Sequence, residues 1–128
     1  MRYVKLDEAI LLHETLMHKM QGLSGYDKAR ISYLESALTQ IQNDKYYPSF
    51  LDKLTHLCFA CVKFHPFLDG NKRTALLLSK AFVMLNCPET LNKDFYQRLE
   101  DVVVGVAEDR ISKEQLKEVF ARLLIQKA

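Results

Sequence analysis

The stretch KFHPFLDGNKRTALLLSKAFVMLN, residues 63–86, decides how the rest of the chain is interpreted. Its second half is almost entirely apolar over residues 75–78 and 81–85, which is typical of a helix buried on most sides. The first turn of this helix carries Lys72 and Arg73, where the helix dipole disfavours a cation by about 0.3–1 kcal/mol. An anion held between these side chains and the free N–H groups of the helix start would remove the conflict. On position alone, two solvent-facing side chains that bind nothing are an equal alternative.

The composition indicates an ordinary globular domain. The chain has 128 residues, 48% of them apolar and 27% charged, so we expect one domain over residues 1–128 with a sizeable core. A formal net charge of +2 is too small to indicate a nucleic-acid partner. Lys80 interrupts the longest apolar run before the roughly 18 residues that a membrane span needs, and the N-terminus lacks a signal-like apolar segment. Three cysteines, an odd number, favour a reducing compartment, and we expect a cytoplasmic protein.

Apolar residues recur at helical spacing along the chain and predict about six helices. The first has its apolar face at Leu6, Ile10, Leu11 and Met17. The other five are expected over residues 27–42, 51–65, 71–86, 92–106 and from 112 onward. Caps are expected at Asp7, at Asn92, and at Ser112 with Gln115. The predicted fold class is all-α, a compact helical bundle.

The segment NDKYYPSF, residues 43–50, interrupts the helical pattern. Tyr46 and Tyr47 are residue types that favour strands, which allows a small β-hairpin flap here.

The loop before the fourth helix gathers the residue types of phosphoryl or nucleotidyl transfer. That chemistry needs an anion clamp, a metal ion that neutralises phosphate charge, and a group that accepts a proton from the attacking hydroxyl. Histidine (His65) is the usual proton acceptor near neutral pH, and a carboxylate (Asp69) suits Mg²⁺. The backbone and cations of residues 70–73 would form the clamp, with arginine able to grip two oxygens at once. Taken singly, each of these residues also has a purely structural explanation.

The motif HPFLDGNKRTA, residues 65–75, resembles the signature of the Fic/Doc family, and specifically its Doc (death-on-curing) toxin branch. Three further segments also resemble the family, so that the likeness covers nearly the whole chain. They are GYDKARISYLESAL (25–38), YPSFLDKLTHLCFACVKF (47–64) and VAEDRISKEQLKEVFARLL (106–124). The resemblance implies a compact helical fold that uses ATP and Mg²⁺.

Two positions separate the branches of the family. Fic AMP-transferases have a second glycine where this chain has Lys72, and a second arginine where it has Leu76. The Doc branch carries a lysine, and the resemblance implies that ATP is bound in the reverse sense and the γ-phosphate is transferred. The chain would then be a protein kinase. The target known for the branch is a threonine of translation elongation factor Tu, whose modification stops protein synthesis.

The resemblance also implies a role for each motif residue. The catalytic set is His65, Asp69, Lys72 and Arg73. His65 would deprotonate the target hydroxyl, and Asp69 would hold Mg²⁺. Gly70 and Asn71 would present the anion cradle, while Lys72 and Arg73 would hold the phosphates and stabilise the transition state.

The implied partners are a target protein and an antitoxin. Residues 43–50 match the place where the family has a flap that docks an extended target segment, so Tyr46 and Tyr47 are target contacts or, equally, packing residues. No glutamate is followed by Gly or Asn, so the in-chain inhibitory helix of many Fic proteins is not expected. Restraint would come instead from an antitoxin whose C-terminal segment folds into a helical groove. No direct nucleic-acid or membrane partner is expected.

Other interpretations stay open at this point. The chain could be an AMP-transferase that tolerates Lys72, or a catalytically silent binding module of an antitoxin–DNA complex. The CFAC spacing at residues 58–61 falls inside an apolar helix, which favours packing over a redox or zinc site with His56 and His65. His13 and Phe67 are expected to be buried structural residues.

Overall fold

The computed structural model describes residues 1–124, and within them the chain is all-α, as predicted. The six α-helices are α1 (Leu6–Met20), α2 (Ile31–Gln40), α3 (Phe50–Phe64), α4 (Asn71–Asn86), α5 (Phe95–Ala107) and α6 (Lys113–Leu123). A short 3₁₀ helix, η1 (Pro88–Thr90), follows α4. None of the helices in residues 1–124 is long and apolar enough to cross a bilayer.

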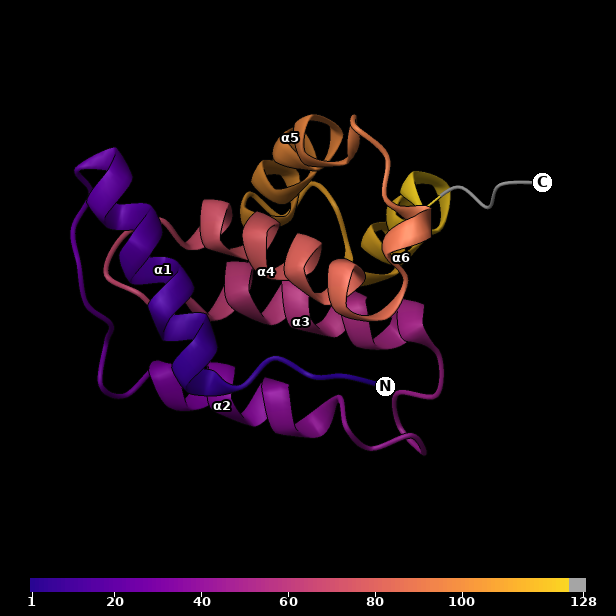
Figure 1. Cartoon of the computed structure of the whole chain (residues 1–128), viewed down its shortest axis with the longest axis horizontal. Coiled ribbons are helices and arrows are strands. Elements are labelled where there is room, and N and C mark those ends of the chain that lie inside the picture. Colours follow the sequence, from indigo (N-terminus) through magenta and orange to yellow (C-terminus); the bar gives the residue numbers. More distant parts are fainter. Residues whose placement is uncertain (125–128) are drawn as a thin grey trace.

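Helices α3 and α4 lie side by side through the middle of the molecule (Figure 1). Helix α3 packs against α2, α4, α5 and α6, whereas α1 lies beside the N-terminal end of α4, near the motif loop. The buried face of α4 comprises Thr74, Ala75, Leu76, Leu78, Ser79, Phe82 and Val83. The prediction that α4 is buried on most sides does not hold at its last turn, where Met84 and Leu85 are exposed. Leu11 is also not on an inward face: it is 67% exposed, on the side of α1 that faces α4 and α5 across a groove.

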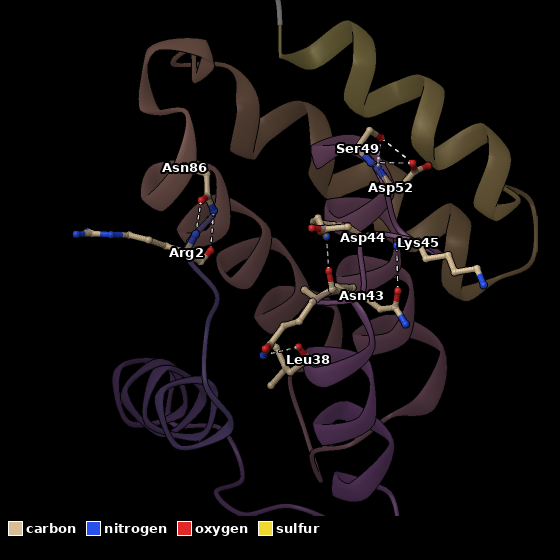
Figure 2. Close-up of polar contacts among 11 residues, drawn as sticks. Arg2, Leu38, Asn43, Asp44, Lys45, Ser49, Asp52 and Asn86 are labelled. Carbon is tan, nitrogen blue, oxygen red and sulfur yellow. Dashed lines mark hydrogen bonds and ion pairs between the residues drawn. The ribbon is translucent and has the colours of Figure 1, made fainter.

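Hydrogen bonds between residues close in the sequence cap the first turns of α3 and α6. Ser112 and Gln115 form the predicted capping box of α6, and Ser49 forms a second one with Asp52 at the start of α3 (Figure 2). Asp7 and Asn92 are not caps. Helix α1 begins after Lys5, whose N–H donates to Glu8, and the side chain of Asn92 closes a turn by accepting from the N–H of Asp94.

The small hairpin that the sequence allows near residue 46 does not form, and in the described residues the chain turns there without a strand. The side chain of Asn43 accepts from the N–H of Lys45 (Figure 2). The backbone carbonyl of Asn43 accepts from the N–H of Tyr47. Asparagine favours such a turn because its side chain replaces a backbone acceptor. For the same reason α2 begins at Ile31 rather than at Asp27, since the Asp27 carboxylate accepts from the N–H groups of Ala29 and Arg30.

Two polar contacts tie distant segments to this frame. The side chain of Asn86 makes two hydrogen bonds to the backbone of Arg2, which hold the N-terminal segment on the end of α4 (Figure 2). Lys53 of α3 is only 1% exposed, yet its ammonium donates to the carbonyl of Ile41 at 2.6 Å and to the carboxylate of Asp44 at 2.7 Å. Because a buried charge needs partners, this lysine joins the end of α2 to α3.

Candidate active site

The motif loop joins the C-terminal end of α3 to the N-terminal end of α4. His65 ends α3 in the left-handed region, with φ 49° and ψ 57°, and Gly70 precedes α4 with φ 72°. A non-glycine residue in that region costs on the order of 1 kcal/mol, so the surrounding structure must hold His65 there. The side chains of His65 and Asp69 are both exposed, whereas Phe67 between them is buried, as predicted.

Asn71 closes the loop. Its side-chain oxygen accepts from the N–H of Phe67, and its amide nitrogen donates to the carbonyl of Phe67, both at 2.9 Å. The Asn71 side chain therefore does not cap the helix, because both of its polar atoms are bonded to the backbone of Phe67. What residue 71 offers to an anion is its backbone N–H at the start of α4.

An extended segment of residues 22–27 lies against the motif loop, and the sequence did not identify it as part of the site. Tyr26 pairs with Phe67 in an isolated antiparallel bridge. Around this pair, the N–H of Asp27 donates to the carbonyl of Pro66 at 2.9 Å, and that of Leu68 donates to the carbonyl of Gly25 at 3.1 Å. The one signal in the sequence is the pair of glycines at 22 and 25, since Gly25 has φ 101°.

Asp69 is held by this segment as well. One carboxylate oxygen, Oδ2, accepts from the N–H of Leu23 at 3.0 Å. Oδ1 has no hydrogen bond within residues 1–124 and is the oxygen that a cation could use.

Two consecutive residues of α1, His13 and Glu14, bind the backbone of the motif loop and of the segment 22–27. His13 is fully buried, stacks on the ring of Phe67 at 3.9 Å between centroids, and its Nε2 lies 2.8 Å from the carbonyl oxygen of Asp69. Glu14 accepts from the N–H of Gly25 at 2.9 Å. That backbone hydrogen bond is the main reason why the pKa of Glu14 is lowered, and a hydrogen bond from Ser24 adds to it.

The start of α4 opens into a cavity of about 260 Å³. Its walls are Asp69, Gly70, Asn71, Lys72, Arg73 and Leu76 on one side, and Glu100, Val103 and Val104 of α5 on the other. Arg73 and Glu100 lie 4.0 Å apart between Nη2 and Oε2, and both side chains are about half exposed. Backbone N–H groups, two cations and two carboxylates thus meet in one cavity, an arrangement that suits a phosphate with a hard cation.

Tyr46 and Tyr47 are not part of this arrangement. They line a separate pocket with Asp52 and Thr55 at the N-terminal end of α3, together with Lys113, Glu114 and Lys117. The motif loop follows the other end of α3, which is 15 residues long, so about 22 Å of helix lies between them. Residues 22–27, rather than 43–50, lie next to the motif.

The buried cysteines belong to the core. Burial raises the pKa of the Cys58 thiol to about 12 and raises that of Cys61 further, so neither is a reactive thiolate. His56 makes hydrogen bonds with Gln40 and Lys113, and burial, followed by the charge of Lys113, lowers its pKa to about 4. Among residues 1–124 no three His, Cys, Asp or Glu side chains gather as a metal site.

A second, larger cavity of about 710 Å³ forms a groove between α1, α4 and α5. Its apolar lining is Leu11, Leu12, Leu16, Met20, Leu77 and Tyr96. The charged groups along it are Glu8, Lys19, Arg73 and Lys80. Arg73 therefore borders both the groove and the cavity at the start of α4.

The fold and the site define a small helical domain with an anion cavity at a helix start, as expected of a transferase that handles phosphate groups. The sequence profile of the Fic/DOC family matches residues 3–83, well over half of the chain, and the protein belongs to this family. The match extends from α1 through the motif loop into α4. A search of curated protein sequences returned no match. Members of the family are typically nucleotidyl- or phosphotransferases that use ATP and Mg²⁺.

Proposed function

We propose that this protein is a Doc-type toxin that transfers the γ-phosphate of ATP to a threonine of elongation factor Tu and so blocks translation. Positions 72 and 76 carry the proposal. Lys72 is exposed at the mouth of the anion cavity, whereas Leu76 is 2% exposed in its wall. The AMP-transferase pattern has a glycine and an arginine at these positions. With a cation at 72 and a buried apolar residue at 76, the cations that α4 presents to this cavity, Lys72 and Arg73, both lie in its first turn.

The residues of the site suit the groups of an in-line phosphoryl transfer. The target hydroxyl attacks the γ-phosphorus, the bond to the ADP oxygen breaks, and His65 accepts the hydroxyl proton. Lys72 and Arg73 bind the phosphate oxygens and stabilise the charge of the transition state. Asp69 offers Oδ1 to Mg²⁺, which typically uses one or two carboxylates and the phosphates of its substrate. When bound with ATP, Mg²⁺ neutralises phosphate charge.

The extended segment 22–27 is the surface we assign to the target. Its exposed apolar side chains Leu23 and Tyr26 lie beside the equally exposed Leu68 of the motif loop. A chain bound along this edge would gain backbone hydrogen bonds and apolar contacts close to His65. Tyr46 and Tyr47, at the other end of α3, are poorly placed for this task.

The groove between α1, α4 and α5 is where we place the antitoxin. Its apolar lining suits the apolar face of an amphipathic helix. Three of its four charged residues are cationic (Lys19, Arg73 and Lys80), which favours an acidic segment. Because Arg73 also lines the phosphate cavity, an occupant of the groove can compete with phosphate for this side chain.

The decisive experiment incubates purified protein, Mg²⁺ and elongation factor Tu with ATP labelled at the α- or the γ-phosphate, followed by mass spectrometry of the target. Transfer of the γ-label, absent in His65→Ala and retained in His18→Ala, is the expected result; His18 is a comparably exposed histidine on α1. Transfer of the α-label would mean that the protein is an AMP-transferase despite Lys72. If His65→Ala remained as toxic to cells as the parent, the protein would be a binding module.

The antitoxin assignment has its own test. ATP turnover is measured with and without the product of the neighbouring gene, which we expect to inhibit it. Leu16→Glu in the groove should abolish the inhibition without lowering turnover, whereas Met84→Glu, an exposed apolar position outside the groove, should not. Unchanged turnover on addition of the neighbouring product would contradict the assignment.

A further inference from the structure

We propose that His13 is a positioning residue of the phosphate site. It holds the Asp69 carbonyl inward, and this turns the N–H of Gly70 toward the cavity. This role rests on the proposed function only in that it requires a phosphate to bind at the start of α4.

In the hydrogen bond between His13 and the motif loop, His13 is the donor. A carbonyl oxygen only accepts hydrogen bonds, so Nε2, at 2.8 Å from the oxygen of Asp69, carries the proton and donates it. The ring has little freedom to leave this position, because it is fully buried and lies almost parallel to Phe67, at 9° between planes. The donor therefore points at one fixed place in the loop.

Because the peptide group is planar, a hydrogen bond that fixes the carbonyl of Asp69 also fixes the direction of the N–H of Gly70. The chain has no cis peptide bond in residues 1–124, and in a trans peptide the C=O and the following N–H point in opposite directions. Since the carbonyl of Asp69 points to the buried His13, the N–H of Gly70 points away from it, to the side where both residues line the cavity. Without a donor at position 13, this peptide could rotate and withdraw the N–H.

The groups on either side of this peptide have hydrogen bonds of their own, so we expect the loss of His13 to affect only the peptide between Asp69 and Gly70. The carbonyl of Gly70 accepts from the N–H of Thr74 at 2.9 Å as part of α4. The carboxylate of Asp69 is held by Leu23, and the start of the loop is held by Asn71. Loss of the His13 hydrogen bond should thus weaken phosphate binding while leaving the rest of the loop in place.

Two substitutions separate the hydrogen bond from the packing. His13→Phe keeps an aromatic ring against Phe67 and lacks a donor; His13→Gln places an amide N–H near the position of Nε2. The probes are ADP and, separately, inorganic pyrophosphate, with binding measured by calorimetry and the Gly70 amide resonance followed by NMR. His18→Phe, an exposed histidine on the same helix, is the matched control. Melting temperatures establish that each variant is folded, and His13→Leu replaces the Phe variant if that one is not.

We expect His13→Phe to bind both probes about tenfold more weakly, which corresponds to the loss of one hydrogen bond to a charged group. His13→Gln should stay within about threefold of the parent on the same scale. The Gly70 resonance should shift on binding in the parent and in the Gln variant only.

Equal affinities and equal Gly70 shifts in the parent and His13→Phe would overturn the proposal. A parent that binds pyrophosphate but not ADP would refute the nucleotide function, and the pyrophosphate affinities would then decide the role of His13. A parent that binds neither probe would refute both.

Discussion

Replacing Gly70 by alanine is expected to lower the free energy of unfolding for two separable reasons. At φ 72° an L-residue loses about 1–2 kcal/mol from its backbone conformation. An added Cβ would also lie 2.3 Å from Cε and 3.1 Å from Sδ of Met17, which is almost fully buried and has to move. Overpacking of this kind costs about 1–3 kcal/mol. The expected total is about 2–5 kcal/mol.

Gly22 provides the matched comparison. An added Cβ at this position would lie 2.6 Å from the same sulfur atom of Met17, and 3.0 Å from Oδ2 of Asp69. Gly22 does not have a positive φ, so Gly22→Ala should lose only the steric part, about 1–3 kcal/mol.

Chemical denaturation of single and double variants measures the two parts. Met17→Ala removes the atoms that the new methyl groups would meet, and by itself costs about 2–5 kcal/mol. In the Met17→Ala background, Gly70→Ala should cost only its conformational part of about 1–2 kcal/mol. Gly22→Ala should cost less than in the parent, because only the contact of the new methyl group with Oδ2 of Asp69 remains. If both glycine substitutions cost the same in the two backgrounds, within about 0.5 kcal/mol, the argument that Met17 occupies the space beside both glycines is refuted.

Three further predictions concern other parts of the molecule. Asn71→Ala should destabilise the protein by about 1–3 kcal/mol, because the N–H and carbonyl of Phe67 lose their partner; thermal unfolding that leaves the melting temperature unchanged would contradict this. In the native protein, an alkylating reagent should modify the partly exposed Cys87 and leave Cys58 and Cys61 unmodified until the chain is unfolded, as peptide mass mapping can establish. The ammonium of Lys53 lowers the pKa of Asp44 below its usual 3.8, so the stabilisation by this pair is present above pH ~4 and is lost as the pH falls through the lowered pKa. Asp44→Asn should therefore be less stable than the parent at pH 6, with the difference shrinking toward pH 3; a difference independent of pH would show that the carboxylate charge has no part in it.

Local patterns predicted most of the features that depend on neighbouring residues in the chain, although not the caps of α1 and α5 or the start of α2. The six helices, the start of α4 at Asn71 and the capping box of Ser112 follow from apolar spacing and from hydrogen bonds that span three or four residues. The same local rules misplaced Leu11 and the hairpin near residue 46. Leu11 is a residue type that suits a buried face, but it lines an open groove. Tyr46 and Tyr47 are residue types that suit a strand, but they lie in or next to a turn.

The candidate site divides in the same way. The sequence by itself placed His65, Asp69, Lys72 and Arg73 in one short loop and helix start, because they are neighbours in a motif of fixed spacing. Only the tertiary structure brought residues 22–27 and α1 against that loop, and set Glu100 of α5 across the cavity from Arg73. The hydrogen bond from His13 to Asp69 joins residues 56 positions apart, and no periodicity in the sequence encodes a contact over that distance. Such contacts arise when amphipathic helices bury their apolar faces against one another, which brings together polar groups that the chain itself keeps far apart.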